Sequence, residues 1–228
     1  MRKYLSELIG TCVLVFMGCG TAMLVGCDPA GSGYVLTALA FGLSVVAMAY
    51  CVGNISGGHF NAAVTLAMLI RKKISAKEAV GYWIFQLIGA FIGSGLLALI
   101  FSTGGVPDQT GALGSNGLAG VNGSVVAGLL VEIVLTFIFL MTIQGVTSPK
   151  FKHGSFGGLI IGLTLTFVHI FGIGLTGTSV NPSRSIAPAV VAALSGNAEA
   201  LAPLWVFIVG PLVGAALAAV VYPALEKK

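Results

Sequence analysis

Residues 56–69 read SGGHFNAAVTLAML, and residues 176–189 read TGTSVNPSRSIAPA. Aligning the two stretches places Asn61 opposite Asn181, 120 positions later in the chain. Asparagine is among the most favoured residues at a helix N-cap, and proline suits the first helical position. Each stretch therefore predicts a short helix that begins at its asparagine.

The match extends beyond these stretches, which indicates an internal duplication. Two further pairs of segments align at offsets of 120 and 125 positions: residues 41–50 with 161–170, and residues 7–16 with 132–141. We expect a single domain over residues 1–228, with a first repeat over about 1–110 and a second over about 120–228.

The composition is typical of a membrane protein. Of the 228 residues, 57% are hydrophobic and 8% are charged, which is too little charge to cover a soluble globule. A helix of about 20 apolar residues crosses a hydrocarbon core. Six runs meet this need, near residues 4–26, 34–54, 79–101, 124–146, 156–174 and 201–224. The sequence thus predicts an all-α membrane protein with six transmembrane helices, the first retained rather than cleaved as a signal peptide.

The basic residues predict the orientation of these spans. All but Arg184 lie at the termini or in the connections after spans two and four: Arg2, Lys3, Arg71, Lys72, Lys73, Lys77, Lys150, Lys152, Lys227 and Lys228. By the positive-inside rule, both termini and these two connections face the cytoplasm. We therefore expect a multi-pass protein of the plasma (inner) membrane.

The short helix predicted at residues 61–70 cannot cross a membrane, because ten helical residues span only about 15 Å. The repeat predicts its counterpart at residues 181–194. Each repeat holds three spans, and an odd number means that the second repeat starts on the other side of the membrane from the first. The repeats are therefore inverted, so the two short helices enter from opposite sides and meet near the midplane. Irregular backbone at this depth is tolerated where it lines a water-filled cavity. We expect the polar loops 53–60 and 172–179 to line a pore.

Arg184 follows the second asparagine by three positions. A charge at the centre of a lipid-facing helix costs about 2.5–3.5 kcal/mol, so the side chain is expected to face the pore. The alternative is an arginine that snorkels to the membrane surface. The four cysteines, Cys12, Cys19, Cys27 and Cys51, lack CxxC spacing. They predict small buried thiols, with neither a metal site nor a disulfide framework.

These features resemble the aquaporin, or major intrinsic protein, family over essentially the whole chain. The family's duplicated Asn-Pro-Ala signature corresponds here to Asn61-Ala62-Ala63 and Asn181-Pro182-Ser183. The resemblance implies six transmembrane helices plus two re-entrant half-helices. Alanine preserves the first half-helix, because it is the best helix former, but we expect Ala62 to loosen the contact between the half-helix tips. We expect Ser183 to add a hydroxyl close to the pore.

The resemblance also implies a selectivity filter. Its four positions fall on Phe41, His169, Thr178 and Arg184. Phenylalanine and histidine at the first two positions are similar to water-specific members. Members that conduct glycerol tend to have tryptophan and glycine there and aspartate after the arginine, where this chain has Ser185.

Glu7 and Glu132 lie early in spans one and four. In the family, such glutamates accept hydrogen bonds from the loops that carry the asparagines, and a buried carboxylate needs partners of this kind. The alternative is a surface position near a span end. They are the only acids that we place inside spans, whereas an ion-coupled secondary transporter is expected to have more.

Together these features predict a passive water channel that excludes protons and ions. The half-helix amino ends make the pore centre electropositive, which opposes cations and protons. The alternative is a channel for glycerol or other small neutral solutes, and a secondary transporter is less consistent with the sequence. We expect no enzymatic activity, because no nucleophile and base converge. We expect no cofactor and no nucleic-acid partner and, by family analogy, a homotetramer.

Overall fold

The computed structural model describes residues 1–150 and 154–226, where all regular structure is helical. Six helical segments are long and apolar enough to cross a membrane, which confirms the predicted number. Their helices are α1 (Arg2–Val25), α2 (Ser32–Met48), α5 (Ala76–Gly104), α6 (Val125–Val146), α7 (Gly157–Thr176) and α9 (Val206–Glu226). Lys152, Lys227 and Lys228, which entered the orientation prediction, lie outside the described residues.

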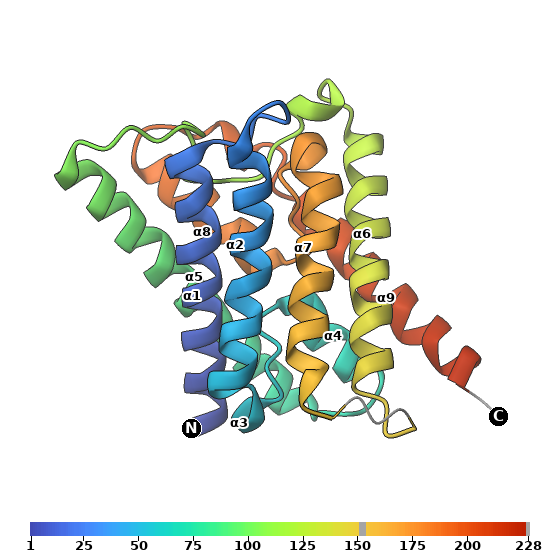
Figure 1. Cartoon of the computed structure of the whole chain (residues 1–228). Coiled ribbons are helices and arrows are strands. Elements are labelled where there is room, and N and C mark those ends of the chain that lie inside the picture. The colour runs from blue at the N-terminus through green and yellow to red at the C-terminus, as the bar shows by residue number, and fades with distance from the viewer. Residues whose placement is uncertain (151–153, 227–228) are drawn as a thin grey trace.

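Two half-length helices also form, α4 (Ala62–Ile70) and α8 (Pro182–Leu194), with Asn61 and Asn181 as their N-caps. In Figure 1, α4 lies in the lower half of the bundle and α8 in the upper half. Both termini lie at the lower end of this view. We call that end the terminal face, and we call the end that carries residues 105–124 the opposite face.

The helices pack with the symmetry of the two repeats. α1 packs against α2 and α5, as α6 packs against α7 and α9, and α2 contacts α7 between the halves. Each half-helix also packs on a long helix of the other repeat, α4 on α9 and α8 on α5. The two half-helices are therefore fixed relative to each other by both halves of the chain.

Small residues allow this close packing. A side chain on Gly89 of α5 would collide with the Leu8 carbonyl of α1, and one on Gly214 of α9 would collide with the Ile133 carbonyl of α6. Without a hydrophobic driving force between helices in lipid, close backbone contact of this kind is a main source of helix association.

The long connections contain short helices. α2 continues through a π-helical turn, η1 (Ala49–Gly53), into α3 (Asn54–Ser56). Three 3₁₀ turns lie elsewhere: η2 (Ala119–Val121), η3 (Gly154–Phe156) and η4 (Glu199–Leu201).

Some element boundaries were predicted wrongly. α5 begins at Ala76 rather than near residue 79, because Ser75 caps a charged first turn that hydropathy misses. The predicted loops 53–60 and 172–179 are too long, since α3 and α7 continue into them. Helical backbone bonds persist until Gly57 and Gly177, whose φ angles of 93° and 73° end the helices in the left-handed conformation.

The prediction of buried thiols is correct for Cys19, which is buried. Cys12 and Cys27 are half-buried, and Cys51 is exposed. An apolar sequence position in a membrane protein can face lipid as well as the protein interior, so hydropathy does not distinguish these cases.

Candidate functional site

The two asparagines join the half-helices at the centre of the molecule. Asn61 Oδ1 accepts a hydrogen bond from Ala63 N at 2.7 Å, and Asn181 Oδ1 accepts one from Ser183 N at 3.1 Å. Each side-chain amide also donates across the repeat boundary, Asn61 Nδ2 to the Val180 carbonyl at 2.7 Å and Asn181 Nδ2 to the Phe60 carbonyl at 3.0 Å. Each asparagine thus caps its own half-helix and binds the loop of the other.

The first signature motif gains a bond from its departure from proline. Ala62 N lies 3.4 Å from Asn181 Oδ1 and donates to it. A proline at this position has no N–H to donate. The Ala62 amide thus adds a contact between the half-helix tips, although the proline ring is absent.

The loops before the asparagines hold strained backbone. Phe60 and Val180 have φ angles of 48° and 46°, a region that costs a non-glycine residue roughly 1–2 kcal/mol. Such conformations persist only where the surroundings fix them. The surroundings here are two fully buried carboxylates, Glu7 and Glu132, each 0% exposed.

Glu7 receives four hydrogen bonds. Its Oε2 accepts from Phe60 N and from Gln86 Nε2, both at 2.7 Å. Its Oε1 accepts from Ser56 Oγ at 2.7 Å and from His59 N at 3.0 Å. The alternative of a surface position for Glu7 is thus excluded.

Glu132 holds the second loop in the corresponding way. Its Oε1 accepts from Thr176 Oγ1 at 2.8 Å and Ser179 N at 2.9 Å, and its Oε2 accepts from Val180 N at 2.8 Å. Each left-handed residue that precedes an asparagine therefore donates its N–H to a buried carboxylate.

Two cavities lie end to end along the axis of the bundle. A cavity of about 430 Å³ runs from Phe41 and Arg184 past the asparagines toward the terminal face, and one of about 330 Å³ lies toward the opposite face. Phe41 and Arg184 line both cavities, and His169 lines the larger one. Phe41 and Arg184 therefore lie where the two cavities meet, and His169 stacks against Phe41 beside this point.

The three side chains form a compact stack. The Phe41 and His169 rings have centroids 4.4 Å apart with an interplanar angle of 22°. Arg184 Cζ lies 4.8 Å from the centroid of the Phe41 ring. Because Arg184 is buried, with 2% of its surface exposed, the alternative of an arginine that snorkels to the membrane surface is excluded. Arg184 Nη1 donates to the Gly114 carbonyl at 2.9 Å and Nη2 to the Gly177 carbonyl at 3.4 Å.

His169 presents one free nitrogen. Its Nδ1 lies 2.9 Å from the Leu165 carbonyl, which can only accept, so Nδ1 carries a hydrogen. Within the described part of the chain, Nε2 has no hydrogen-bond partner although it is buried. In the neutral ring, Nε2 is an acceptor available to a permeating molecule.

Thr178 and Ser183 lie outside the cavity walls. Among the described residues, neither lines the two cavities. Thr178 is 0% exposed, and a side chain on Gly172 would lie 2.5 Å from its hydroxyl. Ser183 is 1% exposed. Both hydroxyl oxygens are buried, and neither has a hydrogen-bond partner within the described part of the chain.

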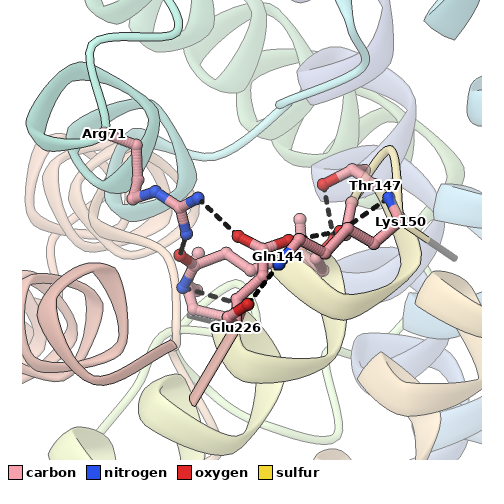
Figure 2. Close-up of polar contacts among 8 residues, drawn as sticks. Arg71, Gln144, Thr147, Lys150 and Glu226 are labelled. Carbon is pink, nitrogen blue, oxygen red and sulfur yellow. Dashed lines mark hydrogen bonds and ion pairs between the residues drawn. The ribbon is translucent and has the colours of Figure 1, made fainter. Parts of the chain in front are cut away.

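At the terminal face, Arg71 connects three parts of the chain that line the larger cavity. Its Nη1 donates to Gln144 Oε1 at 2.6 Å, and its Nη2 pairs with Glu226 Oε2 at 3.4 Å. Glu226 also accepts hydrogen bonds from Ser148 and Lys150. Figure 2 shows Arg71 directed at Gln144 and Glu226 from the end of α4. The C-terminal end of α9 is thereby tied to the mouth of the cavity.

The family model described as Major intrinsic protein matches residues 1–222. This chain belongs to the major intrinsic protein family. Members of this family are channels and not enzymes. The resemblance stated from the signature motifs is thus confirmed.

Curated members with similar sequences carry two kinds of name. Glycerol uptake facilitator protein-like 6 of Lactiplantibacillus plantarum is 46% identical over 219 residues, which cover 96% of this chain and 95% of that protein. Aquaporin Z of Brucella melitensis is 42% identical over 229 residues, covering 99% and 98%. The family is therefore shown by sequence, while the permeant is not.

A solved major intrinsic protein has the same fold. The aquaglyceroporin from Plasmodium falciparum superposes with a TM-score of 0.88 and 24% identity, covering 99% of this chain and 98% of the other. At this identity the comparison supports the fold alone.

Several residues around the site of this major intrinsic protein were not predicted from the sequence. Gln86 is a polar, fully buried residue of a long apolar helix, and polarity at such a position is itself a functional signal. The Gly114 carbonyl carries no sequence signal, because any residue has a backbone oxygen. Its bond to Arg184 joins positions 70 residues apart.

Proposed function

We propose that this chain is a passive water channel with a selectivity filter at Phe41, His169 and Arg184. The observation that carries the proposal is the stack of these three side chains between the two cavities. Two stacked rings and an arginine narrow the lumen where the cavities meet, which favours water over a bulkier polyol. Thr178 belongs to this filter through its backbone, next to the Gly177 carbonyl that binds Arg184.

The polar groups of the filter replace the hydrogen bonds that water loses on entry. Arg184 supplies N–H donors, and its Nε has no hydrogen-bond partner among residues 1–150 and 154–226. His169 Nε2 supplies an acceptor in the neutral ring. A donor on one side and an acceptor on the other match the two hydrogen-bonding roles of water, and the fixed charge of Arg184 repels cations.

Proton and ion exclusion rests on the centre of the pore. Asn61 and Asn181 each use an Nδ2 hydrogen on a loop carbonyl, and an amide nitrogen has a second hydrogen to offer to water. Two half-helix amino ends, each equivalent to about half a positive charge, meet there. Water can turn its oxygen toward them, whereas a cation or a proton meets a barrier.

Glu7 and Glu132 act in this proposal as loop supports. Their bonds to the left-handed residues Phe60 and Val180 keep the asparagines in place. We assign the altered signature motifs, Asn61-Ala62-Ala63 and Asn181-Pro182-Ser183, the role of half-helix starts.

The proposal includes an orientation and an assembly. The terminal face, where Arg71 and Lys150 lie, is the cytoplasmic side by the positive-inside rule, so both termini are cytoplasmic and the membrane is the plasma (inner) membrane. A homotetramer with one pore per subunit follows from family analogy. The two repeats of the single domain, about 1–110 and 120–228, contribute one half-helix each.

The second candidate function is a channel for glycerol or other small neutral solutes. It is favoured by the relative named as a glycerol uptake facilitator-like protein, which is 46% identical. The aromatic ring of Phe41 against His169 argues for the narrower filter of a water channel.

Swelling of oocytes that express the chain separates the two candidates. In dilute medium, expressing cells are expected to swell faster than uninjected cells, and their uptake of labelled glycerol is expected to equal that of uninjected cells. Swelling at the uninjected rate would overturn the proposal, and fast glycerol uptake would establish the second candidate.

A further inference from the structure

The orientation of the Arg184 guanidinium depends on one loop carbonyl at the opposite face. Of its two carbonyl partners, Gly114 O is closer to its donor nitrogen, at 2.9 Å, than Gly177 O, at 3.4 Å. A hydrogen bond at 2.9 Å lies at the optimum for N–H···O, whereas one at 3.4 Å is weak. Whatever fixes the Gly114 carbonyl therefore also fixes the filter arginine.

Gly114 lies in a strained turn against α1. Leu113 and Gly114 have successive left-handed φ angles of 53° and 69°. A side chain on Gly114 would lie 2.8 Å from Cys19 Cβ, so the turn touches the helix. Left-handed backbone at Leu113 is unfavourable and persists only if neighbouring contacts impose it.

Those contacts come from Asp108 and Thr110. Asp108 Oδ2 accepts from Leu113 N at 2.7 Å, and Asp108 Oδ1 accepts from Thr110 N at 2.8 Å. The Thr110 hydroxyl donates to Asp108 Oδ1 at 2.7 Å and accepts from Gly114 N at 2.8 Å. One carboxylate and one hydroxyl thus bind the amides of both left-handed residues. We call Asp108 and Thr110 the outer clip.

The outer clip is itself anchored at both ends. Gln109 N donates to the Met23 carbonyl of α1 at 2.8 Å. Asn197 Nδ2, beyond the end of α8, donates to the Gly111 carbonyl at 2.8 Å. Thr110 also lines the cavity of the opposite face together with Arg184. The hydrogen bonds that run from Asp108 through Thr110 and Gly114 to Arg184 therefore start in a segment that is itself bound to α1 and to Asn197.

We propose that Asp108 and Thr110 are positioning residues that set the width of the filter by holding the Gly114 carbonyl against Arg184. This inference deepens the proposed function and rests on it. Without the outer clip, Leu113 relaxes from the left-handed region, the Gly114 carbonyl turns away, and the guanidinium loses its better acceptor. A mobile Arg184 opens the filter to solutes larger than water, so the outer clip acts on selectivity rather than on water flux.

The test compares the ratio of glycerol to water permeability in proteoliposomes of the full chain. This ratio cancels the number of inserted channels, so a loss of folded protein alone does not change it. Thr110→Ala removes the hydroxyl, and Thr110→Ser keeps it. Asp108→Asn replaces one acceptor oxygen with an N–H₂ group. Asp28→Asn is the matched control, since Asp28 lines the same cavity and, among residues 1–150 and 154–226, its carboxylate accepts from Ala30 N alone, in its own turn.

We expect Thr110→Ala and Asp108→Asn to raise the ratio by about three- to tenfold, the factor that one lost hydrogen bond represents. Thr110→Ser and Asp28→Asn are expected to keep the wild-type ratio. Wild-type ratios in both Thr110→Ala and Asp108→Asn would overturn the inference, as would a Thr110→Ser variant that behaves like Thr110→Ala.

Failure of the proposed function gives a different pattern. Wild-type vesicles without water permeability contradict the function before any variant is compared. Wild-type vesicles that pass glycerol contradict water specificity, and the ratio is then measured with erythritol, where the outer clip still predicts a rise in Thr110→Ala and Asp108→Asn. Retained selectivity in those two variants, beside a water-conducting wild type, contradicts the outer clip alone.

Discussion

The Ala62 amide donates to Asn181 Oδ1 across the centre of the molecule, at a nitrogen–oxygen distance of 3.4 Å. The Asn181 side chain therefore caps its own half-helix and holds the first residue of the other. Asn61 cannot receive the equivalent bond, because Pro182 has no N–H. The two halves are thus similar in fold and unequal at the point where they meet.

Ala62→Pro tests how much the hydrogen bond from the Ala62 amide, which has no counterpart at Pro182, matters to the channel. The change removes a long neutral hydrogen bond, worth about 0.5 kcal/mol at the low end of the usual range, and adds a residue that is favourable at the first helical position. We expect the thermal midpoint in detergent to change little and water permeability to stay within about twofold, since the two effects offset. A collapse of water permeability to that of protein-free vesicles would show that the Ala62 amide is essential.

Glu132→Gln is expected to destabilise the fold. Whichever way the new amide turns, its N–H₂ group faces a backbone N–H of Ser179 or Val180 and leaves it unsatisfied, at a cost of about 1–3 kcal/mol. Thermal unfolding in detergent measures the change. Glu199→Gln is the matched control, because Glu199 is exposed. Equal midpoints for the two variants would contradict the support role.

Arg71→Ala should lower the free energy of unfolding by about 1–3 kcal/mol, because it leaves the Oε1 atom of the buried Gln144 without its charged donor. Lys3→Ala at the same face is the control. The Lys3 side chain is 57% exposed, against 17% for Arg71, and surface ion pairs of this kind contribute little to stability. Unfolding in mixed micelles with increasing SDS ranks the two variants, and the opposite ranking would refute the account of the terminal face.

His169→Gly combined with Phe41→Ala should admit glycerol. The double change removes the stacked rings, whose centroids are 4.4 Å apart, and leaves Arg184 on one wall. Glycerol permeability of proteoliposomes is expected to rise above that of wild type. Phe171→Ala is the control, because Phe171 is 64% exposed and lies on the outer surface of the bundle. Unchanged glycerol exclusion in the double variant would mean that the constriction lies elsewhere.

The half-helices could be predicted from the sequence because capping is local chemistry. Asn61 and Asn181 bind amides two residues ahead, and such bonds depend on a few neighbouring residues. The six spans could be predicted from hydropathy, because a helix that crosses the hydrocarbon core needs a continuous run of apolar residues.

Other features depend on contacts between distant residues and left no local signal. The bond from Arg184 to Gly114 spans 70 residues, and the hydrogen bond from Gln86 to Glu7 spans 79. Thr178 and Ser183 were expected near the pore by resemblance, but a motif does not specify the direction of a side chain, and neither residue is among those that line the two cavities.

We propose that this chain conducts water and excludes glycerol. Stopped-flow light scattering of proteoliposomes under equal osmotic gradients of sucrose and of glycerol measures both properties in one preparation. We expect fast shrinkage in both solutes, well above the rate of protein-free vesicles, with reswelling in glycerol no faster than in those vesicles. Shrinkage at the protein-free rate, or rapid reswelling in glycerol, would contradict the proposal.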